Sequence, residues 1–196
     1  MPRKSVDGLF WSRDEGNMEI TKSSRHQKVI GDFGESVICN WLSRSGFEVI
    51  RVDHTGIDIV AYRPSTGQRL GITVKSTTRL SGKENDSVNV LSYRAGNSDR
   101  EKVLQACSAF ACEPWMAVYV ETTDFAQVYL TSLEHFDRKY RRKAARTVDA
   151  WMMGPRDREA YAEDPDVKHI RIDFRATNWS WERQERERTV SETDDG

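Results

Sequence analysis

Three segments between Gly31 and Ser76 decide the fold of this chain. They read GDFGESVICNWLSRSGFEVIRV from residue 31, GIDIVAY from residue 56 and LGITVKS from residue 70. The first repeats its apolar residues at helical spacing and then changes to β-branched residues, whereas the other two have the composition of strands. We therefore predict a helix over Gln27–Ser45 and strands over Phe47–Val52, Ile57–Tyr62 and Leu70–Ser76.

Each part of this stretch carries a charged side chain where an apolar residue is expected. On a helical wheel, Glu35 falls within the apolar arc of the first helix. Asp58 is flanked by isoleucines, and Lys75 shares one face of its strand with Thr73. Buried charges cost free energy unless they are paired or bind a metal, so the set indicates a site. Taken singly, each residue has a plainer interpretation as a core glutamate, a turn aspartate or an exposed lysine.

The ordered set resembles the PD-(D/E)XK nuclease superfamily, and most closely its archaeal-type Holliday-junction resolvases and restriction-type endonucleases. The resemblance covers residues 27–76 and implies an α/β fold with a central mixed β-sheet flanked by helices, the restriction-endonuclease-like core. It assigns catalytic roles to Glu35 in GxxGE, Asp58 in GIDIV and Lys75 in TVKS. Thr73 departs from the pattern, because the family usually has Glu, Asp or Gln two residues before the lysine.

The resemblance implies a Mg²⁺-dependent (or Mn²⁺-dependent) endonuclease that hydrolyses phosphodiester bonds in DNA. Its metal ligands would be Glu35, Asp58 and the carbonyl of Val74, while Lys75 would orient the attacking water or stabilise charge on the phosphate. Thr73 would be a catalytic-site residue that offers only a neutral hydroxyl, which predicts weak metal binding. The alternative is a nuclease-like fold that binds nucleic acid or protein without cleaving, and the net charge of −1 favours it.

The length of 196 residues is typical of one domain with tails. We expect a flexible N-terminal arm over 1–25, a nuclease-like domain over 26–175 and a charged C-terminal tail over 176–196. The three cysteines lack zinc spacing and fit free thiols in a reducing cytoplasm, so a cytoplasmic location is expected. No apolar run approaches about 18 residues, so no membrane partner is expected. Nucleases of this type are often dimers, which makes a homodimer an expectation.

Two stretches outside these segments carry basic residues that could contact nucleic acid. One is the long connection over Thr77–Asn97, and the other is Phe136–Met153, which we expect to be helical. Contact with phosphate is the functional interpretation of both, whereas a solvated loop and a solvated helix face are the plainer ones. The candidates for nucleic-acid contact are Arg79, Lys83, Arg138, Arg141, Arg142 and Lys143.

The remaining sequence predicts further elements around the same sheet. A helix is expected over Asp99–Cys112, and the almost wholly apolar run Trp115–Val120 indicates a central strand covered on both faces. Lys168–Phe174 alternates apolar and charged residues, which is typical of an edge strand, and Arg156–Asp166 is polar and loop-like. His135 has no partner at metal-ligand spacing and is expected on the surface.

Overall fold

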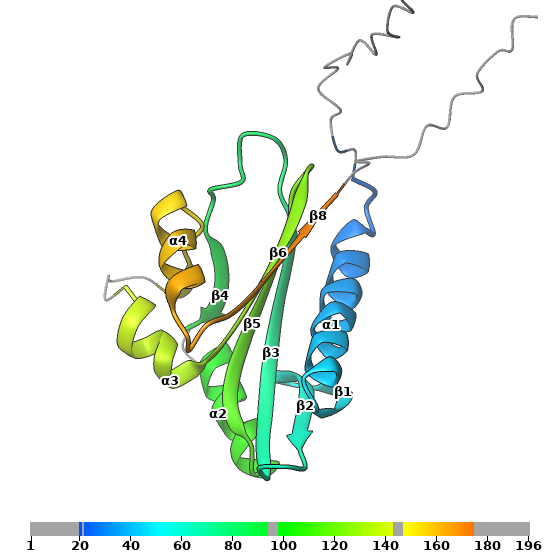
Figure 1. Ribbon diagram of the computed structural model, residues 1–196, viewed down its shortest axis with the longest axis vertical. Coiled ribbons are helices and arrows are strands. Elements are labelled where there is room, and N and C mark those ends of the chain that lie inside the picture. The colour runs from blue at the N-terminus through cyan, green and yellow to red at the C-terminus, as the bar shows by residue number, and fades with distance from the viewer. Residues whose placement is uncertain (1–19, 21, 94–97, 143–146, 175–196) are drawn as a thin grey trace, which may run out of the picture.

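The chain folds around a six-stranded β-sheet, shown by a computed structural model that describes residue 20 and residues 22–93, 98–142 and 147–174 (Figure 1). The elements, in chain order, are α1 (His26–Arg44), β1 (Glu48–His54), β2 (Ile57–Arg63), β3 (Gln68–Thr78), β4 (Val88–Ser92), α2 (Asp99–Ala109), β5 (Glu113–Glu121), β6 (Phe125–Ser132), α3 (Leu133–His135), the π-helical turn η1 (Phe136–Tyr140), β7 (Val148–Trp151), α4 (Pro155–Glu163) and β8 (Lys168–Asp173).

The main sheet is mixed, with the strand order β1-β2-β3-β5-β6-β8. Strands β3 and β5 pair in parallel, and all other neighbours in this sheet are antiparallel. Strand β5 lies inside the sheet and is buried from Met116 to Val120, while β8 lies at an edge, as the sequence predicts. The predicted α/β architecture, a mixed sheet flanked by helices, is confirmed. Among the described residues, no helix is both long and apolar enough to cross a membrane.

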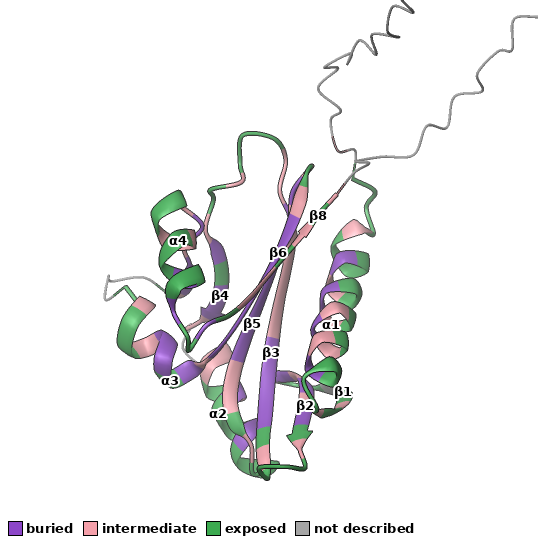
Figure 2. Ribbon diagram, in the orientation of Figure 1, coloured by how far each residue is buried: buried purple, intermediate pink, exposed green. Residues whose placement is uncertain are grey.

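The two faces of the sheet carry separate hydrophobic clusters. Figure 2 shows that many residues of the central strands are buried. On one face, Ile38 and Leu42 of α1 pack with Ile72 of β3. On the other face, the cluster joins the sheet to α2, α4 and a separate two-stranded β4–β7 sheet, with Trp151 and Tyr161 among its buried side chains. Alternation along the central strands therefore decides which layer each side chain meets.

Close packing of α1 against the sheet depends on one glycine. A Cβ at Gly34 would lie 2.1 Å from the Oγ of Ser76 on β3 and 3.1 Å from the Cβ atoms of Ser76 and Tyr119, so a side chain there would require Ser76 and its surroundings to shift. The helix ends at Arg44, and Gly46 follows with a φ of +83°. Both features agree with the predicted helix and its stop.

Two predicted elements are wrong. Residues 136–153 do not form one helix, because η1 ends at Tyr140 and β7 begins at Val148, where it pairs with β4. The segment 156–166 is not a loop throughout, since it contains most of α4, with Pro155 in its first turn. Proline suits this position because the first N–H groups of a helix need no intrahelical acceptor. The polar composition of α4 obscured its helical character.

Candidate active site

A cavity of about 130 Å³ lies between the β1–β2 turn, strand β3 and the start of α2. The structure therefore brings together three of the residues that the sequence singles out, Asp58, Thr73 and Lys75. The complete lining consists of Thr55, Gly56, Asp58, Thr73, Lys75, Asp99, Lys102 and Val103.

The cavity opens where the pairing of β2 with β3 stops. The paired register runs from Arg63 and Gln68 to Ile59 and Ile72. Two residues further along β3, the backbone N–H of Val74 donates a 2.6 Å hydrogen bond to Oδ2 of Asp58 instead of to a strand carbonyl. The N–H and C=O of one strand residue point toward the same neighbouring strand, so the carbonyl of Val74 also faces the Asp58 side.

Alternation of side chains along β3 decides on which face of the sheet the site lies. Ile72 and Val74 pack in the cluster on the α1 side of the sheet, whereas Thr73 and Lys75 line the cavity on the α2 side. Thr73 is buried, with 5 % of its surface exposed, so its hydroxyl is one of the polar groups that the sheet presents to the cavity. The common face predicted for Thr73 and Lys75 is confirmed.

Glu35 does not line this cavity. Its Oε2 accepts hydrogen bonds from Nη2 of Arg51 at 2.7 Å and from Nε at 2.9 Å. Arg51 pairs across β1–β2 with Ile59, whose side chain packs on the α1 side, so this ion pair lies on the face opposite Thr73 and Lys75. The structure thus separates Glu35 from the residues with which it is grouped in the sequence, and its role as a metal ligand stays a prediction.

Asp99 supplies a second carboxylate that the sequence analysis missed. It lies at the start of α2, where Ser98 caps the helix by accepting a hydrogen bond from the N–H of Glu101. Oδ2 of Asp99 accepts hydrogen bonds from the hydroxyl of Ser92 at 2.8 Å and from its N–H at 3.2 Å. Burial alone would raise the pKa of Asp99, but these bonds and the charge of Lys75 lower it. An ionised carboxylate therefore faces the candidate site.

The oxygen donors around the cavity fit a hard divalent cation. They are the carboxylates of Asp58 and Asp99 and the carbonyl of Val74, and Mg²⁺ typically binds through one or two carboxylates while it keeps several waters. Lys75 and Lys102 bring two positive charges that balance the two carboxylates. This balance predicts a modest metal affinity and a site able to accept an anionic phosphate beside the metal.

The predicted nucleic-acid residues on the connection after β3 lie in different settings. Nη2 of Arg79 donates to the carbonyl of Ser87 at 2.6 Å and to that of Asp86 at 3.3 Å, so Arg79 closes its own loop. Lys83 is exposed on the same loop. Contact of either residue with phosphate stays a prediction.

Several of the basic residues that follow α3 already have polar partners. Nε of Arg141 lies 3.1 Å from the buried carboxylate of Asp149, and Nη2 of Arg142 lies 3.3 Å from Asp157. Arg138 donates to the imidazole of His135. Lys143 lies outside the described residues. These pairs give Arg138, Arg141 and Arg142 a structural role, and their contact with nucleic acid stays a prediction.

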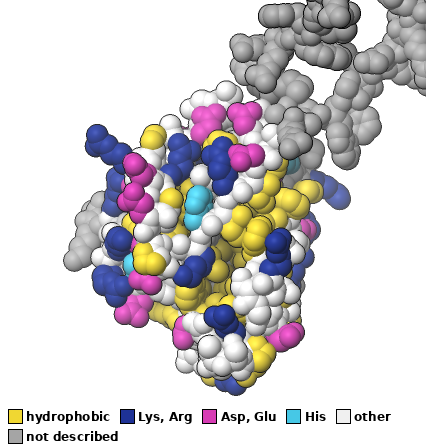
Figure 3. Space-filling model, viewed as in Figure 1, with side chains coloured by type: hydrophobic (Ala, Val, Ile, Leu, Met, Phe, Trp, Pro, Cys, Tyr) yellow, Lys and Arg dark blue, Asp and Glu magenta, His cyan; other side chains and the backbone are white. Residues whose placement is uncertain are grey.

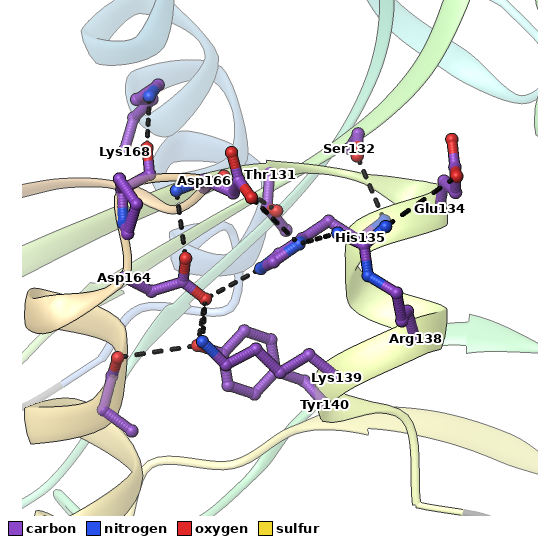
Figure 4. Close-up of polar contacts among 12 residues, drawn as sticks. Thr131, Ser132, Glu134, His135, Arg138, Lys139, Tyr140, Asp164, Asp166 and Lys168 are labelled. Atoms are coloured by element: carbon purple, nitrogen blue, oxygen red, sulfur yellow. Dashed lines mark hydrogen bonds and ion pairs between the residues drawn. The ribbon is translucent and has the colours of Figure 1, made fainter.

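The prediction that His135 lies on the surface is wrong, because His135 is 6 % exposed and bound to the buried Asp164 (Figure 4). Nε2 of His135 lies 2.7 Å from Oδ2 of Asp164. The same oxygen accepts hydrogen bonds from Nζ of Lys139 at 2.8 Å and from the hydroxyl of Tyr140 at 2.5 Å, and Oδ1 accepts one from the N–H of Asp166 at 3.0 Å. The partner of His135 comes 29 residues later, so sequence spacing gives no signal of it.

Burial alone would raise the pKa of Asp164, but the hydrogen bonds that it accepts from three side chains hold that pKa well below its ordinary value. Within the described residues, the group of His135, Asp164 and Asp166 has metal-binding spacing, since its ligand atoms lie within 4.8 Å of one another. The carboxylate of Asp164, however, already accepts hydrogen bonds from Lys139 and the other donors. This cluster therefore links α3, η1 and the segment after α4.

Among known proteins, the chain is similar to solved structures only in its fold. No family model and no curated protein matches the sequence. The match is structural. Among solved structures, the chain is similar to Hjc of Archaeoglobus fulgidus, a Holliday junction resolvase from an archaeal hyperthermophile, with 19 % identity and a TM-score of 0.44. The similarity covers 62 % of this chain and 83 % of the resolvase. The cavity at Asp58, Thr73 and Lys75 is therefore the feature of this chain that bears on its function.

Proposed function

We propose that the chain is a metal-dependent endonuclease that hydrolyses phosphodiester bonds in DNA. The observation that supports this most strongly is the convergence of Asp58, Thr73 and Lys75 on one cavity, at the point where the β2–β3 pairing stops. The resemblance of the motifs GIDIV and TVKS to PD-(D/E)XK nucleases gives these residues their roles. The homodimer and the cytoplasmic location stay predictions of the sequence.

Each side chain has a distinct task in this proposal. Asp58 and the carbonyl of Val74 hold the cation, and Mg²⁺, when bound, supplies positive charge and an acidified water. Lys75 donates a hydrogen bond to a phosphate oxygen and stabilises the charge that develops there. The carboxylate of Asp99 attracts the positive charge of Lys75 across the same cavity, and the buried hydroxyl of Thr73 binds water without adding charge.

A second candidate function is binding of nucleic acid without cleavage. Two observations favour it: Arg51 occupies the carboxylate of Glu35, and Thr73 replaces the usual acidic residue. With two lysines against two carboxylates, the cavity could accept a phosphate without any metal.

A cleavage assay with Mg²⁺ or Mn²⁺ on a four-way junction, duplex DNA, single-stranded DNA and RNA separates the two functions. The matched pair of variants is Asp58→Asn and Asp32→Asn, because Asp32 is an exposed aspartate of α1 that pairs with Lys28. We expect the wild type and Asp32→Asn to cleave DNA and Asp58→Asn to lose activity by about a hundredfold or more. Metal-independent binding without cleavage of any substrate would favour the second function.

A further inference from the structure

An apolar groove lies on the face of the sheet opposite the candidate active site. Its volume is about 320 Å³, and it separates the C-terminal half of α1 from strands β6 and β8. Figure 3 shows the hydrophobic side chains that line this hollow. Its main apolar residues are Ile38, Trp41, Leu42, Trp115, Leu130 and Ile170.

The groove exists because α1 covers only part of this face. The helix packs against β1, β2 and β3, and no described helix covers β6 and β8 on the same side. Phe33 of α1, which packs edge-on against Tyr119 of β5, remains 49 % exposed. Apolar surface left in water is unfavourable by about 25 cal/mol per Å², and contiguous patches of it commonly mark interaction sites.

The chain supplies a suitable occupant next to the groove. Strand β8 forms one wall through Lys168 and Ile170, and the described part of the chain ends at Phe174. Trp179 and Trp181 follow within the next seven residues. An extended chain advances about 3.3 Å per residue, so they can reach roughly 17 to 23 Å from Phe174, whereas Ile170 lies about 13 Å back along the strand.

The side chains of the C-terminal segment also match those of the groove in apolar character and in charge. Tryptophan is a typical anchor residue, because its ring buries about 150–250 Å² and its N–H can stay at a polar rim. The charged residues that line the groove, Arg63 and Lys168, are both basic. Glu182 directly follows Trp181 and can pair with either.

We propose that the C-terminal segment 176–196 folds back and inserts Trp179 and Trp181 into the groove between α1 and β8. This contact covers the open half of the sheet on the α1 side. It involves no residue of the Asp58 cavity, so it stands independently of the proposed nuclease activity.

Hydrogen exchange of the full-length chain tests the docking directly. The double variant Trp179→Ala/Trp181→Ala should exchange about tenfold faster than the wild type in segments 38–47, 128–132 and 168–173. Trp11→Ala, a tryptophan in the other terminal segment, is the control and should leave these segments unchanged. Equal exchange in the wild type and the double variant would overturn the proposal. The proposal would also be overturned if the protection against exchange disappeared when the protein is diluted and sedimentation showed that a dimer dissociates over the same concentrations. A second copy of the chain would then occupy the groove.

A peptide of residues 176–190, added to full-length protein, gives an independent test by fluorescence anisotropy. It should bind the double variant, whose groove is vacated, at least about thirtyfold more tightly than it binds the wild type, whose own tail competes. The same peptide with both tryptophans changed to alanine should not bind. Equal affinity for the two proteins, or binding that does not need the tryptophans, would contradict the proposal.

Discussion

Asp58 and Asp164 are two carboxylates of one chain that meet their surroundings in different ways. Oδ1 and Oδ2 of Asp164 together accept hydrogen bonds from four donors, and its side chain is 2 % exposed. Asp58 receives one backbone hydrogen bond, from Val74, and lines an open cavity with two lysines nearby. A carboxylate whose donors are all supplied by the protein stabilises the fold, whereas one that faces an opening beside cations is available to a metal or a substrate.

The largest effect on stability should come from removing the carboxylate of Asp164, which accepts four hydrogen bonds. We expect Asp164→Ala to lower the free energy of unfolding by about 3–5 kcal/mol, because it leaves Lys139 and His135 without their buried partner. Urea unfolding measures the change. Asp166→Ala is the matched control, since the side chain of Asp166 is 63 % exposed, and it should change stability by less than about 1 kcal/mol. Equal costs for the two substitutions would contradict the distinction between the carboxylates.

The same cluster predicts how stability depends on pH. The pKa of Asp164 is lower in the folded than in the unfolded chain, so folding favours its ionised form. Its contribution is therefore complete above the unfolded pKa of about 4 and is lost as the pH falls below that value. The stability difference between the wild type and Asp164→Ala should shrink between pH 5 and pH 2. A difference that stays constant over this range would show that the charge of Asp164 is unimportant.

A smaller effect should come from adding charge to the open cavity. Thr73→Glu places a third carboxylate beside Asp58 and Asp99, and it should tighten Mg²⁺ binding by about tenfold and raise cleavage at low Mg²⁺. Calorimetric titration measures the affinity, with Thr73→Val as the control that removes only the hydroxyl. Without metal, Thr73→Glu should be less stable than the wild type through repulsion of like charges. Unchanged metal affinity with lowered stability would mean that the cavity does not hold a cation.

The smallest effect is expected at Glu35. Its carboxylate is bound by Arg51 on the α1 side of the sheet, so Glu35→Gln should lower the rate of DNA cleavage by less than about threefold. Cleavage kinetics at saturating Mg²⁺ provide the measurement. A loss as large as that of Asp58→Asn would show that Glu35 leaves Arg51 and joins the metal site when substrate binds.

The sequence predicts the parts of the site that depend on local periodicity. Side chains alternate along a strand, so Thr73 and Lys75 had to share a face, and the interruption of an apolar strand by Asp58 marked the place. Gly34 is similar, because a glycine on the apolar face of a helix indicates a close approach, here to Ser76.

The rest depends on contacts between distant segments. Asp99 reaches the cavity only because the connection after β3 returns α2 to the sheet, and no spacing rule fixes that path. The wheel places Glu35 on the inner side of α1, but it cannot show that Arg51 of β1 reaches the carboxylate. For the same reason His135 looked like a surface residue, since the chain position of Asp164 gives no sign that the two meet.

The central claim is that Asp58 holds a metal that the nuclease reaction needs. Calorimetric titration of Mg²⁺ into the wild type and Asp58→Asn, with cleavage of a DNA junction measured on the same samples, tests it most directly. We predict that the wild type binds Mg²⁺ and cleaves, and that Asp58→Asn, with an unchanged thermal unfolding transition, does neither. Equal Mg²⁺ binding and equal cleavage by the two proteins would contradict the account.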